Sequence, residues 1–141
     1  MKGKLILMCA VGIISLCLVA CAPQQVPVSV DVSCDDFAAS GNITEEVEVG
    51  VGELLTVTLC SNPTTGFEWS SEAQISDQAV LQQTDHKFVA PESDLVGAPG
   101  EEVWTFKTLQ QGASNVSMEY GRPWEGGEKA AWTFVLTVDV K

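Results

Sequence analysis

The sequence predicts an all-β domain, a sandwich of about seven to eight antiparallel strands, on three observations. Apolar and polar residues alternate with a period of two in several short segments. Turn signals rich in Gly, Pro and Asn separate these segments. No segment after residue 20 shows the spacing of an amphipathic helix. Many short strands joined by such turns are typical of a β-sandwich.

The alternation can be followed from one predicted strand to the next. Val28, Val30 and Val32 share one face of the first strand. In the last strand, every second residue from Trp132 to Val140 is apolar. The predicted strands span residues 28–34, 44–50, 53–60, 66–71, 79–89, 101–109, 114–121 and 130–140.

Composition restricts the kind of partner that the chain can have. The 141 residues are enough for one domain, and the 45% hydrophobic content, with four Trp and five Phe, is enough for a core. The formal charge is −12. Without residues 1–20, which hold Lys2 and Lys4, the chain has five basic and 19 acidic residues and therefore a formal charge of −14. Such a domain is repelled by phosphate backbones, so we expect no nucleic-acid partner.

The first 20 residues are predicted to be an export signal. Lys2 and Lys4 precede the uncharged, mostly apolar run from Leu5 to Ala20. This run is shorter than the roughly 20 residues of a membrane-spanning helix. A positive start, an apolar middle and small residues at the end are typical of a cleaved secretory signal.

The signal ends in a sequence that resembles the bacterial lipobox, Leu18-Val19-Ala20-Cys21. We therefore expect Cys21 to be lipidated and to become the first residue of the mature protein, which acyl chains would anchor in a membrane. The expected organisation is a signal peptide at 1–20, lipidated Cys21 with a tether at 21–27, and the domain at 28–141. The protein would be exported and anchored on the extracytoplasmic face. The alternative is an ordinary signal peptide with Cys21 near the cut.

Cys34 and Cys60 remain after the two cysteines of the signal and Cys21 are set aside. In an exported domain, two thiols most simply form one disulfide. A bond that closes this loop would stabilise the fold by about 3–4 kcal/mol. The alternative is a metal or redox pair, but with His86 as the only histidine the chain lacks ligands for zinc. We expect no metal and no cofactor.

Three connections carry unusual residues. In the first, Pro63 fixes φ and Gly66 permits a positive φ, which favours a rigid turn. Alternate connections of a sandwich project from the same end, so the three loops can form one surface. Their sequences are Asn62-Pro63-Thr64-Thr65-Gly66-Phe67, Gly97-Ala98-Pro99-Gly100 and Tyr120-Gly121-Arg122-Pro123-Trp124-Glu125-Gly126-Gly127, of which the third contains the motif Arg122-Pro123-Trp124.

These motifs resemble the chagasin family, inhibitors of papain-like cysteine proteases with an immunoglobulin-like β-sandwich fold. The resemblance covers about residues 28–141 and rests on Asn-Pro-Thr-Thr-Gly before an aromatic residue and on Arg-Pro-Trp before the last strand. The middle loop departs from the family's Gly-x-Gly-Gly-like run, because Pro99 removes one amide donor.

The resemblance implies a wedge of three loops in the cleft of the protease. The 62–67 loop would enter the catalytic site, with Thr64 and Thr65 closest to the nucleophilic cysteine and its histidine. The 97–100 loop would lie along the nonprimed side. Trp124, with the two residues before it, would pack on the primed side as a binding hot spot. Alternatively, Trp124 could fold back as a lid on the core.

Two other classes of function are alternatives to inhibition. An enzyme is not expected, because His86 has no free cysteine as a partner and the acidic residues are scattered. No small-molecule substrate is expected either. A surface-anchored immunoglobulin-like adhesion or assembly module is the stronger alternative, since such folds host many functions. An adhesion module has no reason to carry both loop motifs.

Overall fold

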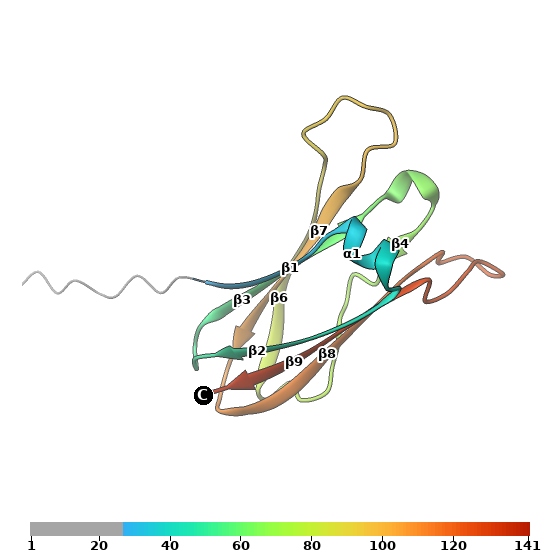
Figure 1. Cartoon of the computed structure of the whole chain (residues 1–141). Coiled ribbons are helices and arrows are strands. Elements are labelled where there is room, and N and C mark those ends of the chain that lie inside the picture. Colours follow the sequence, from blue (N-terminus) through green and yellow to red (C-terminus); the bar gives the residue numbers. More distant parts are fainter. Residues whose placement is uncertain (1–26) are drawn as a thin grey trace, which may run out of the picture.

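A computed structural model describes residues 27–141 as two β-sheets packed face to face (Figure 1). Within these residues, no helix has the length and apolar character needed to cross a membrane. The strands and helical segments, in chain order, are β1 (Val28–Val32), α1 (Cys34–Ala39), β2 (Asn42–Val49), β3 (Leu54–Ser61), the 3₁₀ turn η1 (Pro63–Thr65), β4 (Glu68–Trp69), β5 (Gln74–Ile75), β6 (Leu81–Val89), β7 (Gly100–Thr108), β8 (Gly112–Gly121) and β9 (Trp132–Val140).

The core lies between the sheets and consists of the inward-facing residues of the alternating strands. This confirms the predicted all-β sandwich, because the period of two places one face of each strand in the core. At most 1% of each of these side chains is exposed: Leu55, Val57, Leu59, Trp104, Phe106, Val116, Met118, Phe134, Leu136 and Val138.

The two sheets are mixed, so the prediction that all strands pair antiparallel was wrong for two pairs. The strand orders are β1-β3-β7-β6 and β2-β9-β8-β4, with β5 beside β8. β1 pairs with β3, and β2 pairs with β9, in parallel. The chain crosses to the other sheet through β2 before it returns as β3, so β1 and β3 run in the same direction. Alternation within one strand carries no information on the direction of its neighbour.

The short helix α1 was not predicted, because six residues are too few to show a helical period. Ser33 caps it: its hydroxyl accepts from the Asp36 N–H (3.2 Å), and the Asp36 carboxylate accepts from the Ser33 N–H (3.0 Å). Hydrogen bonds from Ser33 also lower the pKa of Asp36 below its usual value. Phe37 is buried and stacks on Trp132, with 4.9 Å between the ring centroids. The first strand therefore ends at Val32, two residues before Cys34.

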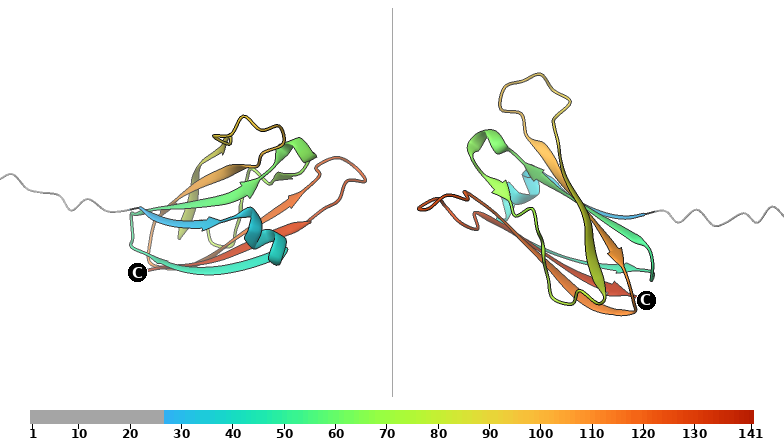
Figure 2. Two further views of the ribbon diagram at one scale, coloured as in Figure 1. Left: turned by 45° about the horizontal axis from the view of Figure 1, so that its top comes forward. Right: turned by 180° about the vertical axis from the view of Figure 1, so that it is seen from behind.

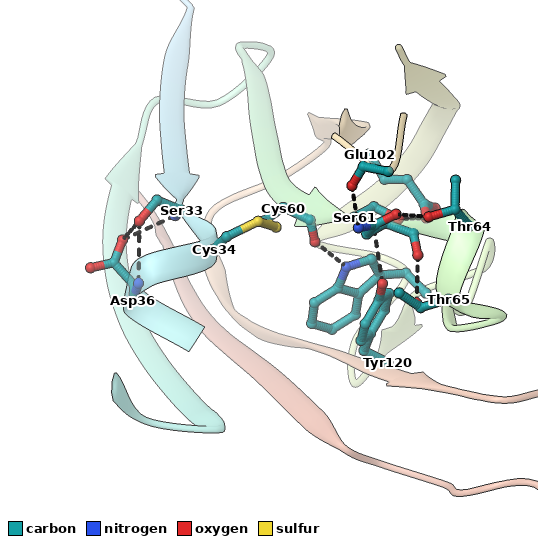
Figure 3. The surroundings of a disulfide bond; sticks show 12 residues. Ser33, Cys34, Asp36, Cys60, Ser61, Thr64, Thr65, Glu102 and Tyr120 are labelled. Atoms are coloured by element: carbon teal, nitrogen blue, oxygen red, sulfur yellow. Dashed lines mark hydrogen bonds between the residues drawn. A yellow bond between two sulfur atoms is a disulfide. The ribbon is translucent and has the colours of Figure 1, made fainter. Parts of the chain in front are cut away.

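The predicted disulfide between Cys34 and Cys60 is confirmed (Figure 3). The Cα atoms of the two residues lie 5.1 Å apart. Val32 pairs with Leu59 across the parallel strands, so the start of α1 comes beside the end of β3. The bond joins α1 to the strand that leads into Asn62.

Candidate binding surface

The connections 62–67, 90–99 and 122–131 lie at the same end of the sandwich, which we call the loop end (Figures 1 and 2). All predicted binding residues except Gly100 belong to these segments. Gly100 is the buried first residue of β7 and pairs with Ser61. A Cβ atom at Gly100 would clash with the carbonyl oxygen of Val89. Gly100 therefore closes the middle loop and is not available for contact.

The first loop is a closed turn. The Thr65 N–H donates to the Asn62 carbonyl (3.2 Å), and the Gly66 N–H donates to the Pro63 carbonyl (3.0 Å), which forms η1. Gly66 then adopts a φ of +79°, in the left-handed region that favours glycine. The positions of Pro63 and Gly66 in the sequence are those that this turn requires.

Asn62 connects the first loop to the rest of the molecule. Its backbone N–H donates to the Tyr120 hydroxyl (2.9 Å), and its side-chain amide donates to the Gly97 carbonyl (3.0 Å). The Thr64 hydroxyl donates to the Asn62 side-chain oxygen (2.6 Å), and the Thr65 hydroxyl donates to the Asn62 carbonyl (2.6 Å) (Figure 3). Both threonine side chains are exposed, and these hydrogen bonds fix their orientation. The loop is thus preorganised for binding, which reduces the entropy lost on association.

Arg122 joins the third loop to the first. Its guanidinium carbon lies 4.3 Å from the centre of the Phe67 ring and 5.8 Å from that of Trp124. One guanidinium nitrogen donates to the Thr65 carbonyl (3.4 Å). Together with the bond from Asn62 to Gly97, this contact links all three loops at the first one.

Trp124 lies on the surface of the loop end. Its side chain is 52% exposed, which rules out the lid on the core. It lies against Gly66, where a Cβ atom would come 2.7 Å from the Trp124 ring. Lys129 fixes the backbone of this loop, because its ammonium group donates to the Trp124 carbonyl (2.9 Å) and to the Arg122 carbonyl (2.5 Å). The glycine in the first loop and the tryptophan in the third thus form one contact.

The middle loop is longer than the sequence motif indicated, and its tip is apolar. Leu95 is 77% exposed and Val96 is completely exposed. The Ala98 N–H donates to the Leu95 carbonyl (3.2 Å), which closes the turn, and Gly97 adopts a φ of +82°. These two side chains lie outside the loop motif Gly97-Ala98-Pro99-Gly100 that the sequence predicted for contact. Two adjacent apolar residues within a polar, Gly/Pro-rich connection were the available signal.

A row of stacked aromatic rings lies beneath the loops. Tyr120 stacks on Phe67 and on Trp132, with centroid distances of 5.5 and 4.7 Å. Trp132 stacks in turn on Phe37 of α1. The Trp69 ring N–H donates to the carbonyl of Cys60 (2.9 Å). Tyr120 thus both packs in this row and bonds to the first loop.

A buried polar network lies next to the start of the first loop. Ser61, which is fully buried, donates to one oxygen of Glu102 (2.7 Å), and the ring of His86 contacts the other (2.8 Å). His86 also stacks on Trp104. The Glu102 carboxylate lies between the serine and the histidine. The histidine is therefore not placed as a general base beside the serine hydroxyl, as a catalytic nucleophile would require. In residues 27–141, no cluster of three or more His, Cys, Asp or Glu side chains could hold a metal ion.

Comparison with known proteins identifies the family. The family model described as "Chagasin family peptidase inhibitor I42" matches residues 48–138, which include all three loops. The chain belongs to the chagasin family. Members of this family are peptidase inhibitors, not enzymes.

Two curated relatives of the chagasin family are similar in sequence. Chagasin of Trypanosoma cruzi is 39% identical over 80 residues, which cover 55% of this chain and 73% of chagasin. Amoebiasin-2 of Entamoeba histolytica is 27% identical over 110 residues, which cover 74% of this chain and 89% of amoebiasin-2.

Two solved structures share the fold. The cysteine protease inhibitor EhICP2 from Entamoeba histolytica matches with a TM-score of 0.65 and 18% identity, over 83% of this chain and 99% of EhICP2. PbICP-C, solved in complex with falcipain-2, matches with a TM-score of 0.60 and 18% identity, over 81% of this chain and 99% of PbICP-C. At this identity the likeness concerns the fold.

Proposed function

We propose that this member of the chagasin family reversibly inhibits papain-like cysteine endopeptidases by placing the loop end in their active-site cleft. The observation that carries the proposal is the linkage of the three loops through Asn62, Gly97, Thr65 and Arg122. Three separate segments thereby form one exposed, preorganised surface. Two similar structures support the proposal, since EhICP2 is a cysteine protease inhibitor and PbICP-C was solved in complex with falcipain-2.

In this proposal the first loop blocks the nucleophile without being cut. Thr64 and Thr65 lie over the catalytic thiol, where they exclude substrate and water. The backbone of η1 is coiled and bonded to itself, so it does not present a carbonyl to the thiolate in the geometry of attack. Binding therefore ends in a complex and not in cleavage.

The other two loops supply contact area on either side of the first. Gly97, Ala98 and Pro99 lie along the nonprimed side, and the exposed tip at Leu95 and Val96 adds apolar surface there. Arg122-Pro123-Trp124 packs on the primed side. An interface of standard size, about 800 Å² per partner, is within the reach of three loops and can be tight when the loops are rigid.

The test is a titration of active papain with residues 22–141 made without lipid. We expect stoichiometric, reversible inhibition, and mass spectrometry should find the inhibitor intact afterwards. Thr65→Trp is the matched control, because a large ring above the thiol should clash while the fold is kept. If a micromolar excess leaves papain and cathepsin-L-like activity unchanged, the inhibitor proposal fails and the adhesion-module interpretation replaces it.

We further propose that the protein is exported and anchored by lipid on Cys21, on the extracytoplasmic face of a membrane. The support is the sequence Leu18-Val19-Ala20-Cys21 behind a short apolar leader with two lysines at its start. These residues lie outside the part of the chain that the structure describes. The anchor would hold the inhibitor at the cell surface through several acyl chains.

A further inference from the structure

The end of the sandwich opposite the loops is a compact base. It consists of the turns 50–53 and 109–111 and the last residues of β9 (Figures 1 and 2). Backbone hydrogen bonds join these segments: the N–H of Val51 donates to the carbonyl of Lys141 (3.3 Å), and the N–H of Gly52 donates to that of Thr108 (3.1 Å). The base is therefore a rigid surface of its own.

The chain enters the domain at this base. β1 is parallel to β3, with Val28 opposite Leu55, so β1 starts beside the first residues of β3 and runs toward the loop end. β3 itself begins at the base and ends at Ser61, directly before the first loop. Its eight residues, at about 3.3 Å each, separate the base from the loop end by about 26 Å. Whatever precedes Val28 is thus attached at the end remote from the loops.

We infer that the base is a membrane-facing surface, and that the anchored protein directs its loop end away from the lipid. This inference rests on the proposed lipid at Cys21. Residues 22–27 would be the whole link between the lipid and β1, and six residues reach at most about 20 Å. The base is then held near the headgroups, while the loops extend into the aqueous phase.

The side chains of the base fit contact with lipid headgroups. Three apolar residues at this end are partly exposed: Val51 in the turn 50–53 at 48%, Leu54 directly after that turn at 46%, and Leu109 at 41%. These residues can enter the headgroup region, and such contact increases with the apolar area that is buried.

At or near this end, four acidic side chains and one basic side chain have hydrogen-bond or ion-pair partners within the protein. Lys141 lies 3.4 Å from Glu48 and 2.8 Å from Asp139. Glu53 accepts from the Gly50 N–H (3.0 Å), and Asp77 accepts from the Ala79 N–H (2.9 Å).

Acidic side chains are exposed on the rest of the surface as well. The middle and third loops carry exposed carboxylates at Glu92, Asp94, Glu125 and Glu128. The edge strand β2 exposes Glu45 and Glu46. Anionic headgroups repel the exposed carboxylates of the loops, and the short tether holds the base and not the loops near the lipid, so the loops face the aqueous phase. A soluble protease can then reach the loops without release of the inhibitor.

The experiment places nitroxide labels on the lipidated protein in vesicles of phosphatidylethanolamine and phosphatidylglycerol. Labels are attached at Val51→Cys in the base and at Val96→Cys in the loop end, since the native Cys34 and Cys60 are already bonded to each other. Accessibility to oxygen, which concentrates in lipid, is compared with accessibility to a water-soluble nickel chelate. Unlipidated residues 22–141 with the same labels provide the reference, and Leu109→Cys replaces Val51→Cys if that variant fails to fold.

We expect the label in the base to gain oxygen accessibility and lose nickel accessibility on the vesicles, with no change at residue 96. Papain should be inhibited by vesicle-bound protein within about threefold of the rate found for the soluble domain. Equal changes at both labels, a change only at residue 96, or no change at either would overturn the inference. So would loss of inhibition on vesicles by a protein that inhibits in solution. If the soluble domain does not inhibit, the proposed function fails, and the labels still decide the orientation.

Discussion

Trp124 and Gly66 show how single residues shape the loop end. The tryptophan is exposed on one loop and lies against the glycine of another, where any side chain would overlap its ring. Trp124 is therefore placed for contact with a partner, and the stiff residue before it, Pro123, limits the entropy lost on docking.

Trp124→Ala should weaken inhibition of papain much more than it affects folding. Truncation of such an anchor typically removes about 2 kcal/mol of binding energy, roughly a 30-fold rise in the inhibition constant. The loss should appear mainly in the dissociation rate. Inhibition constants and thermal melts measure the two effects, with Lys107→Ala near the base as a control. A variant that binds like the wild type but melts much lower would show that Trp124 is structural.

Glu102 should matter for stability, because it is the acceptor of the buried Ser61 hydroxyl. Glu102→Ala leaves that hydroxyl without a partner and should lower the free energy of unfolding by about 1–3 kcal/mol. Denaturant unfolding measures the change. Its exposed neighbour Glu101 provides the matched control, and Glu101→Ala should have little effect. Equal effects of the two substitutions would argue against the network.

Among the elements, α1 and β3 show how distant segments support the first loop. The disulfide fixes α1 to the last residues of β3, and the loop begins two residues after Cys60. The loop has its own supports as well, because Asn62 is bonded to Tyr120 and to Gly97. The disulfide is therefore expected to contribute to the stability of the domain more than to the shape of the loop.

Reduction of the disulfide should lower the free energy of unfolding by about 3–4 kcal/mol, because the unfolded chain regains the freedom of the closed loop. Inhibition below the melting temperature should change little. Unfolding curves with and without a reductant measure the effect. In the double variant Cys34→Ala, Cys60→Ala the reductant should change nothing. Native, exported protein in which both thiols react with a maleimide would contradict this prediction.

At the scale of the whole molecule, the two proposed roles lie at opposite ends: membrane attachment at the base and protease binding at the loop end. The parallel pairing of β1 with β3 is the reason, because it brings the start of the domain to the end opposite the loops. An anchor placed before β1 therefore need not interfere with a partner at the loops.

Cys21→Ser should release the protein from the membrane fraction. Without the thiol no diacylglyceryl group can be attached, and the acidic domain alone has little attraction for anionic lipid. Cell fractionation measures the change, and mass spectrometry of the wild-type N-terminus should find the acyl chains. Cys17→Ser, within the signal, is the control and should leave anchoring intact. An unmodified N-terminus in the membrane fraction, or equal retention of Cys21→Ser, would rule out the lipid.

The sequence by itself determined the all-β fold, the Cys34–Cys60 bond and the positions of the first and third loops. Each of these depends on local signals. They are the alternation of apolar and polar residues with a period of two, the two cysteines that remain outside the signal and Cys21, and turn residues such as Pro63 and Gly66. The core residues could be predicted for the same reason, because alternation alone assigns each side chain of a strand to one face.

Only the tertiary structure decided the strand directions, the helix α1 and the exposed tip at Leu95 and Val96. It also showed that Gly100 is buried and that Arg122 stacks on Phe67. These features depend on contacts between residues far apart in the chain, such as Val28 with Leu55 or Asn62 with Gly97. A local pattern specifies which side chains face the core, but not which strand becomes the neighbour or in which direction it runs.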